Sequence, residues 1–299
     1  MRKYLFALMT LLLVAAMGLT GCGGEADLGT EENPIIWAFV PSGETQTVTT
    51  GAEELSALLT EETGLYFEVL ITTEYAGAVE AMCADPAEAQ MGSLNTFSYI
   101  LANERCGVEA ELVAVRYGSP TYNGQIIANV DSGIQSLEDL EGATFCRVDP
   151  LSTSGWIIPM LTMRANGINP DTDIEVVDAG SHDAVAAAVY SGDCDAGATF
   201  VDARGNIEED NPDVMDVVQV IATTADIPND GVQFMPGMDE ELKTTIIDAL
   251  LAISETEEGK DALDTAYSWA GLEKHGDDFY DPFRQVLEAS GMSIQDLQD

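Results

Sequence analysis

The sequence predicts an α/β protein of two lobes, each a mainly parallel sheet flanked by helices, with a ligand cleft between the lobes. Short apolar runs alternate with helical patterns from residue 35 onward, and the alternation starts afresh near residue 137. Strands that alternate with helices indicate βαβ units. Strand-like segments at 124–129 and 219–234 are placed to cross between the two units. We therefore assign 34–123 with 231–299 to lobe 1 and 124–230 to lobe 2.

The first 21 residues have the pattern of an export signal. Arg2 and Lys3 precede an apolar run at 4–19, which leads into Leu-Thr-Gly and Cys22. A single-pass anchor is the alternative, but the run is short for a bilayer and basic residues flank one side only. Cys22 after Leu-Thr-Gly resembles the bacterial lipobox, which implies cleavage before this cysteine and its acylation. Residues 22–33 then form an acidic tether with little to bury.

Lobe 1 begins with an apolar run at 35–40 that is closed by Pro-Ser-Gly, the pattern of a buried strand and a turn. A helix is expected at about 49–62, because three leucines share one face and Gly64 follows. The later elements expected in this lobe are a strand at 66–72, a helix at 77–84 and strands at 89–93 and 112–116.

Lobe 2 repeats the alternation. A strand at 143–148 precedes a helix at 156–166, in which Pro159 is tolerated near the first turn. Ser181 can cap a helix at 184–190. Further strands are expected at 174–178 and 196–201. From 221 to 231 the pattern is loop-like, and three helices complete the chain at 240–254, 258–270 and 281–289.

Besides Cys22 the chain has four cysteines, an even number that in an exported protein suggests two disulfides. Of the three pairings, we favour Cys83 with Cys106 and Cys146 with Cys194, since each pair stays within one lobe. Free buried thiols are the alternative. No Cys-x-x-Cys spacing occurs and the chain has two histidines, so we expect neither a zinc site nor a metal receptor.

The charge is strongly negative. Eleven Lys and Arg stand against 53 Asp and Glu, for a formal net charge of −42. Such a surface repels nucleic acid and anionic lipid, so we expect neither as a partner. It also repels a free anion at long range. Salt screens exposed charges within about 10 Å at 0.1 M, however, so a local cluster of donors can still bind an anion.

Such a cluster of donors is present at 149–155. Ser152, Thr153 and Ser154 lie where the strand at 143–148 gives way to a helix. A helix N-terminus presents unpaired N–H groups and the positive end of a dipole. Hydroxyls gathered there suit a tetrahedral oxyanion without help from lysine or arginine. The alternative is an ordinary N-cap, although a cap needs a single hydroxyl.

Several motifs follow one another in a specific order. They are YGSPTYNG at 117–124, DSGI at 131–134, LEDLEG at 137–142, DPLSTSG at 149–155, GINP at 167–170, GSHD at 180–183 and GDCDAG at 192–197. From about residue 75 to 230 this succession resembles the phosphate/phosphite/phosphonate ABC-transporter substrate-binding proteins. The resemblance implies the type II periplasmic-binding-protein fold, with the ligand in the interlobe cleft. The four cysteines discussed above are not part of this pattern.

The resemblance also implies a binding site. It assigns the oxyanion to the hydroxyl and backbone N–H groups of Ser152, Thr153 and Ser154. His182, at a helix start where a neutral donor is favoured over a cation, would donate a further hydrogen bond.

The resemblance assigns the rest of the ligand to residues with a structural alternative. Tyr75 and Tyr122 match aromatic positions that close over the ligand, but either could be a core aromatic. Asp202 and Asp230 match carboxylates that face an amino group on a phosphonate tail. Asp202 could instead pair with Arg204, and Asp230 lies in an Asn-Asp-Gly turn where Asp is common.

The expected function is that of a lipid-anchored, monomeric solute receptor on the outer face of the cytoplasmic membrane, without a cofactor. It would deliver a phosphonate, with aminoalkylphosphonate as one form, to an ABC permease and ATPase. Phosphate or phosphite is the second choice of ligand. A sensory adaptor to a membrane kinase is a rival function. A serine hydrolase is another, but the chain has no Gly-x-Ser-x-Gly elbow and no base beside a nucleophile.

Overall fold

A computed structural model of the chain describes residues 27–294 and 297. The predicted signal peptide and the acylation site at Cys22 lie outside the described residues. Residues 27–33, expected in the tether, include a turn in which the N–H of Gly29 donates to the carbonyl of Asn33 at 2.8 Å. The carbonyl of Gly29 in turn accepts from the N–H of Tyr66 at 2.9 Å. This part of the predicted tether is therefore held against the folded body.

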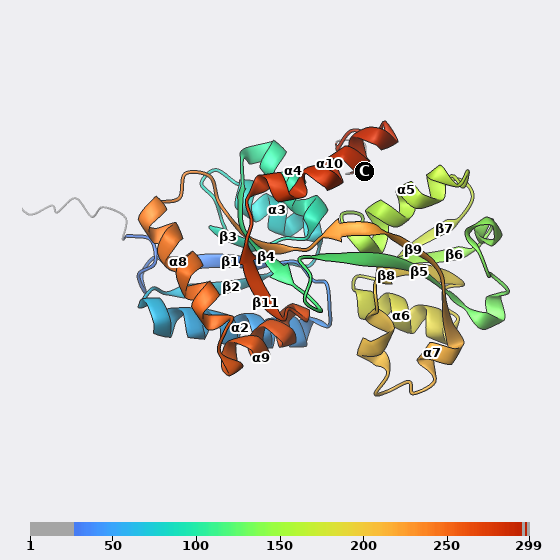
Figure 1. Cartoon of the computed structure of the whole chain (residues 1–299), viewed down its shortest axis with the longest axis horizontal. Helices are drawn as coiled ribbons and strands as arrows, with labels where there is room; N and C mark the ends of the chain where they lie inside the picture. Colours follow the sequence, from blue (N-terminus) through green and yellow to red (C-terminus); the bar gives the residue numbers. More distant parts are fainter. Residues whose placement is uncertain (1–26, 295–296, 298–299) are drawn as a thin grey trace, which may run out of the picture.

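The described chain forms two lobes side by side, each built on its own sheet (Figure 1). The sheet of lobe 1 contains β1 (Ile35–Phe39), β2 (Phe67–Ile71), β3 (Met91–Ser93), β4 (Glu109–Val115), β10 (Gly231–Phe234) and β11 (Gly271–Lys274). The sheet of lobe 2 contains β5 (Thr121–Asn129), β6 (Thr144–Arg147), β7 (Glu175–Asp178), β8 (Ala196–Phe200) and β9 (Val218–Pro228). The strand orders are β11-β4-β10-β3-β1-β2 and β7-β6-β8-β5-β9. The lobe boundaries given above stay a prediction.

Both sheets are mixed. In lobe 1, β1 pairs in parallel with β2 and β3, whereas β10 pairs antiparallel with β3 and β4. In lobe 2, β6 pairs in parallel with β7 and β8, whereas β5 pairs antiparallel with β8 and β9. The parallel pairing that alternation predicts thus holds among β1, β2 and β3 and among β6, β7 and β8, whereas the crossing and C-terminal strands pair antiparallel.

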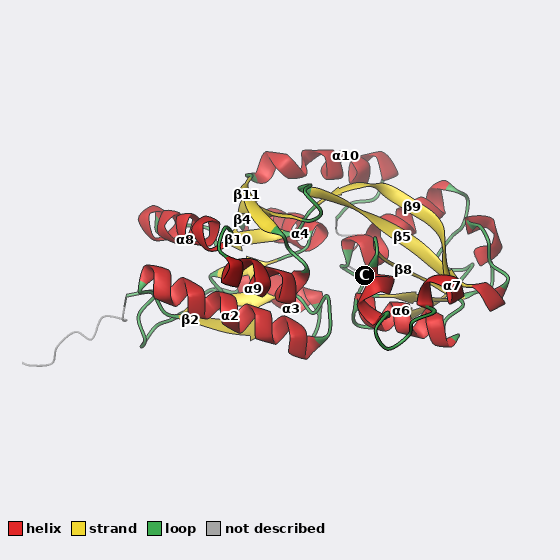
Figure 2. Cartoon of the chain, turned by 60° about the horizontal axis from the view of Figure 1, so that its bottom comes forward, coloured by secondary structure: helices red, strands yellow, loops and turns green. Residues whose placement is uncertain are grey.

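The helices of lobe 1 cover both faces of its sheet. They are α2 (Thr45–Thr63), α3 (Tyr75–Cys83), α4 (Thr96–Cys106), α8 (Glu240–Ile253), α9 (Glu257–Tyr267) and α10 (Asp281–Ser290). Figure 2 shows α2, α8 and α9 packed together, and α3 packs against α4 elsewhere in the lobe. Helix α2 begins earlier than predicted because Glu44 caps it, accepting from the N–H of Thr47 at 2.8 Å.

Helix α4 and strand β11 were not predicted. In α4, residues 96–102 are all buried, so the helix lacks the polar face that makes a helix visible in sequence. The helix starts at Asn95, whose side chain accepts from Ser98, and ends at Gly107 in the left-handed conformation. Strand β11 lies in a stretch to which the prediction assigned no element, and α9 ends at Tyr267, three residues before the predicted end of that helix at 270.

In lobe 2 each helix follows a strand of the sheet along the chain. Its helices are α5 (Ile158–Ala165), α6 (His182–Ser191) and α7 (Val214–Val217), with a π-helical turn η3 (Thr153–Ile157) before α5. Ser181 caps α6 as predicted, accepting from the N–H of Ala184 at 3.2 Å. The loop-like prediction for 221–228 is wrong, because these residues pair with β5 as part of β9.

Two disulfides hold elements together within the lobes. Cys83 at the end of α3 is bonded to Cys106 at the end of α4, and Cys146 in β6 is bonded to Cys194 just before β8. These are the two pairs that the sequence analysis favours. In the part of the chain that the structure describes, no helix combines the length and apolar character needed to cross a membrane.

Candidate ligand-binding site

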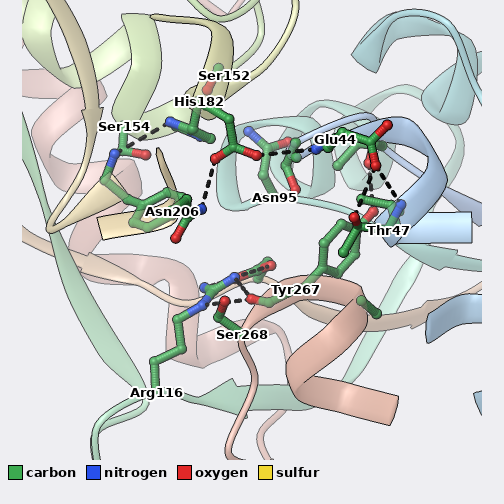
Figure 3. Close-up of a pocket in the computed structure, with 18 of the residues that line it drawn as sticks. Glu44, Thr47, Asn95, Arg116, Ser152, Ser154, His182, Asn206, Tyr267 and Ser268 are labelled. Carbon is green, nitrogen blue, oxygen red and sulfur yellow. Dashed lines mark hydrogen bonds and ion pairs between the residues drawn. The ribbon is translucent and has the colours of Figure 1, made fainter. Parts of the chain in front are cut away.

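A cavity of about 530 Å³ lies between the two lobes (Figure 3). Its walls come from the carboxyl ends of strands β1 and β3 in lobe 1 and β6, β7 and β8 in lobe 2. The lining side chains that carry polar or charged groups are Ser42, Glu44, Thr47, Tyr75, Asn95, Arg116, Tyr122, Ser152, Thr153, Ser154, His182, Asp183, Asn206, Asp230, Asp264, Thr265, Tyr267 and Ser268. This is the position at which open α/β sheets bind ligands.

The turn after β6 presents two backbone N–H groups without a protein acceptor. Ser152 acts as the N-cap, with its hydroxyl accepting from the N–H of Gly155 at 3.2 Å. The carbonyl of Ser152 accepts from Trp156 and Ile157, each at 2.9 Å. Among the described residues, neither the N–H of Thr153 nor that of Ser154 donates a hydrogen bond to a protein acceptor. The ordinary cap therefore coexists with free donors, which is the anion-binding geometry of a helix start.

The hydroxyl of Thr153 is oriented by lobe 1. Its Oγ1 accepts from the backbone N–H of Phe97 and from Nδ2 of Asn95, both at 2.9 Å. These two bonds use the lone pairs of the oxygen, so its hydrogen remains to be donated. Thr153 and Ser154 are 1% and 2% exposed, which shields both donors from solvent and strengthens their hydrogen bonds.

His182 is a neutral donor. The residue is 5% exposed, and Nδ1 accepts from the backbone N–H of Phe200 at 3.3 Å. Burial, together with the positive charge of Arg116, lowers the pKa of His182 from 6.5 to about 3. With Nδ1 used as an acceptor, the single proton of the neutral ring resides on Nε2. The backbone N–H of His182 donates to the carbonyl of Ser42 in lobe 1 at 3.1 Å.

Tyr75 and Tyr122 line the cavity from α3 and β5. Burial raises the pKa of the Tyr75 phenol well above its ordinary value, and the carboxylate of Asp149 adds to the rise. Burial likewise raises the pKa of Tyr122, with a further contribution from Asp230. Both phenols therefore keep their hydrogens and serve as donors.

Asp230 lines the cavity but its oxygens are occupied. Both accept from the guanidinium of Arg116, and Oδ2 also accepts from Nε1 of Trp269 at 3.0 Å. The other bonds of Arg116 run to Oδ1 of Asn229 at 3.0 Å and to the carbonyl of Tyr267 at 2.9 and 3.2 Å. Arg116 thus uses all its N–H groups on the protein, and its charge is neutralised by Asp230.

Asp202 does not line the cavity. Its carboxylate accepts from Nε and Nη2 of Arg204 at 2.8 and 2.5 Å, and from Nε2 of Gln125 at 2.9 Å. The ion pair with Arg204 that the sequence offered as the alternative is therefore formed. The assignment of Asp202 to the ligand needs correction, because its oxygens are held by groups of its own lobe.

The sequence analysis missed several lining residues. Asp183 follows β7, and its two oxygens accept from Nδ2 of Asn206 at 2.7 Å and from the N–H of Glu44 at 3.2 Å. Burial raises the pKa of the Asp183 carboxyl. Glu44, Asp183 and Asn206 each follow a strand, and this position could have indicated from the sequence that they line the cavity. Tyr267 and Ser268 had no local signal, because they reach the cavity from the end of α9.

The lining as a whole is negative. Arg116 is its one cationic side chain among the described residues, whereas Glu44, Asp183, Asp230 and Asp264 are acidic. Within 27–294 no group of three or more His, Cys, Asp or Glu side chains has an arrangement that could hold a metal ion. The site thus combines uncharged hydrogen-bond donors with several carboxylates.

Two α/β lobes that enclose a polar cavity at their strand ends define the class of type II periplasmic substrate-binding proteins. Residues 37–280 match the family described as ABC transporter, phosphonate, periplasmic substrate-binding protein. Because the match spans most of the sequence, the chain belongs to this family.

Individual relatives agree with this assignment. The chain is 31% identical over 177 residues to the phosphate-import protein PhnD of Mycolicibacterium smegmatis, covering 56% of this chain and about half, 54%, of that protein. It is 29% identical over 230 residues to the phosphonates-binding periplasmic protein of Escherichia coli, covering 75% of this chain and 67% of that protein.

Solved structures share the fold. A binding-protein component of an ABC phosphonate transporter from Pseudomonas aeruginosa has a TM-score of 0.78 at 23% identity, with 86% of each chain covered. PhnD1 from Prochlorococcus marinus, solved in complex with methylphosphonate, has a TM-score of 0.76 at 17% identity, with 86% of this chain and 98% of that chain covered.

Proposed function

We propose that this chain is the extracytoplasmic solute-binding component of an ABC importer, and that it captures a small phosphorus oxyanion between its lobes. The observation that carries the proposal is a buried set of uncharged donors without a free cation. The set consists of the N–H groups of Thr153 and Ser154, their hydroxyls, and Nε2 of His182. Family membership supports the same function.

Such donors suit an oxyanion that is released again to a permease. Preorganised dipoles in a buried cavity bind a negative charge well, because they need no reorganisation when the ligand arrives. Tyr75 and Tyr122 add hydroxyls from α3 and β5. Ligand contacts from both lobes favour the closed arrangement over an open one, which is the means by which such a receptor traps its ligand.

We further propose that the ligand is a phosphonate with an amino group on its tail. The lining carboxylates repel a free phosphate or phosphite dianion but attract an ammonium group. Asp183 is the best placed of them, because its partners, Nδ2 of Asn206 and the N–H of Glu44, are uncharged, whereas Asp230 is paired with Arg116. Asp183 therefore takes the role that the resemblance gave to Asp202.

Calorimetric titration of the exported protein in detergent tests the proposal. The panel is 2-aminoethylphosphonate, methylphosphonate, phosphate, phosphite and sulfate. We expect 2-aminoethylphosphonate to bind most tightly and D183N to lose at least tenfold more affinity for it than for methylphosphonate. Equal losses of affinity for the two ligands would show that Asp183 does not contact the amino group. If none of the five compounds binds, the proposed function is wrong.

A serine hydrolase is not favoured by this geometry. A base beside the nucleophile must offer a lone pair. In His182 the lone pair of Nδ1 accepts from Phe200, and Nε2 carries the proton. A sensory adaptor could use the same capture, and ligand uptake by cells lacking this chain distinguishes the two roles, because the import role requires uptake to fall.

We also propose a monomer that is attached to the outer face of the cytoplasmic membrane through acylated Cys22. The motif Leu-Thr-Gly-Cys supports the anchor. Mass spectrometry should find lipid on the wild-type protein and none on C22A. Lipid on the variant would refute the anchor, and a dimer in light scattering would refute the monomer.

A further inference from the structure

Helix α3 lacks a cap from its own lobe. Glu74, at its N-cap position, makes no side-chain capping bond. The N–H of Tyr75, the first residue of the helix, donates instead to Oδ2 of Asp149 at 3.1 Å. Asp149 belongs to the loop after β6 in lobe 2, so the helix is capped across the interlobe boundary. A carboxylate is also the group that the positive end of a helix dipole favours.

The second oxygen of Asp149 organises its own loop. Oδ1 accepts from the N–H of Leu151 at 2.7 Å, one residue before the Ser-Thr-Ser segment. Asp149 is 8% exposed, and burial raises the pKa of its carboxyl, which the two N–H groups partly offset. The carboxylate therefore connects the loop of lobe 2 that carries Ser152, Thr153 and Ser154 to helix α3 of lobe 1, which carries Tyr75.

At the start of two other lobe 1 helices, a backbone N–H also donates to a side-chain oxygen of lobe 2. The N–H of Phe97 in α4 donates to Thr153 at 2.9 Å, and the N–H of Glu44 before α2 donates to Asp183 at 3.2 Å. Thr153 and Asp183 line the ligand cavity, however, whereas Asp149 lies in a neighbouring groove between the lobes. Asp149 can thus be changed without removing a group from the cavity wall.

We propose that Asp149 is a positioning residue that latches the closed receptor and so sets how long the ligand is held. This inference rests on the proposed function of ligand capture. Separation of the lobes breaks the bond between Asp149 and the Tyr75 N–H while leaving the bond to Leu151 within its loop. An interaction made only in the closed arrangement stabilises that arrangement alone, and its loss appears mainly in the dissociation rate.

The test uses D149N in the exported full chain. The amide keeps the size of the carboxylate but puts an NH2 donor in place of one of the two accepting oxygens, so one of the two N–H groups loses its acceptor. We expect the dissociation rate of 2-aminoethylphosphonate to rise about tenfold or more, with an association rate within about twofold of wild type. D149A, which removes both bonds, should raise the dissociation rate at least as much.

D195N is the matched control. The carboxylate of Asp195 also accepts from a backbone N–H, that of Thr144 at 2.9 Å, but entirely within lobe 2. It should leave the dissociation rate unchanged. A D149N protein with the dissociation rate of wild type or of D195N would overturn the latch. So would a D149N protein whose urea midpoint falls while its dissociation rate does not change.

Hydrogen exchange separates this inference from the proposed function. The Tyr75 amide should exchange faster in D149N than in D195N, and equal exchange would overturn the latch. A wild-type protein that binds no compound of the panel would overturn the proposed function. The exchange comparison needs no ligand, so it would still decide whether Asp149 protects Tyr75.

Discussion

The backbone N–H of Phe97 donates a hydrogen bond across the interlobe boundary to the hydroxyl of Thr153, with 2.9 Å between nitrogen and Oγ1. Phe97 lies in the first turn of α4 in lobe 1, and Thr153 opens the π-helical turn in lobe 2. The start of one helix thus orients a donor at the start of another. The contact between the lobes therefore orients a side chain of the candidate site.

Replacement of Thr153 by valine tests this relationship. The change keeps the shape of the side chain but leaves the N–H of Phe97 without its acceptor in the closed arrangement. An unsatisfied buried donor costs about 1–3 kcal/mol, so phosphonate affinity should fall roughly 5- to 150-fold. Calorimetry measures the loss. T162V is the control, because the hydroxyl of Thr162 donates within α5 to Ile158 at 2.8 Å. Equal affinities of T153V and T162V would contradict the prediction.

Replacement of Ser154 by leucine should abolish binding. Ser154 lines the cavity and is 2% exposed. Gly124 packs so closely against it that a Cβ placed on Gly124 would lie 3.2 Å from the Cβ of Ser154. A bulky side chain can therefore extend only into the ligand space. The urea midpoint should change little for the same reason. S191L, at an exposed helix end, should bind normally. Retained affinity in S154L would move the oxyanion away from this turn.

The parts of the site that the sequence predicted follow strands. Ser152, Thr153, Ser154 and His182 lie at the carboxyl ends of β6 and β7, where the alternating pattern fixes both the strand end and the helix start. These positions follow from local signals of periodicity and capping. The same signals were present at Glu44 after β1, where they indicated a turn but not its part in the site.

The parts that could not be predicted depend on distant packing. Arg116 is held by Asp230 and by the carbonyl of Tyr267, which is 151 residues away in the chain. Helix α9 comes close enough for this because Gly51 lets it approach: a Cβ on Gly51 would lie 2.3 Å from the nitrogen of Ala266. No local pattern encodes such a contact. The resemblance likewise gives Asp202 and Asp230 the same role, and only the packing shows that Asp230 lines the cavity and Asp202 does not.

Replacement of Asp230 by asparagine should lower the stability of the protein without changing which ligand it prefers. Arg116 and Asp230 are each 15% exposed, so the change leaves a largely buried guanidinium without its counter-charge. Breaking such a pair costs about 3 kcal/mol, which urea unfolding can measure. Affinities for 2-aminoethylphosphonate and methylphosphonate should fall by similar factors. The control is D226N, whose exposed carboxylate accepts from Asn123. A loss confined to the amino ligand would make Asp230 a tail contact.

Replacement of His182 by glutamine should change how stability depends on pH. The pKa of His182 is about 3 in the folded protein against 6.5 ordinarily, so the unfolded state binds an extra proton between these values. Stability from this residue is therefore complete above pH 6.5 and is lost as the pH falls below it. From pH 7 to pH 5 the loss is about 2 kcal/mol.

The comparison of two variants isolates this contribution. H182Q lacks the extra proton uptake, so its free energy of unfolding should fall by about 2 kcal/mol less than that of wild type between pH 7 and pH 5. H275Q keeps His182 and should follow wild type. The same carboxylates are present in all three proteins, so their contribution is removed by taking the differences. Parallel curves for H182Q and wild type would mean that the imidazole accepts a proton in the folded state, and its role as a neutral donor would fail.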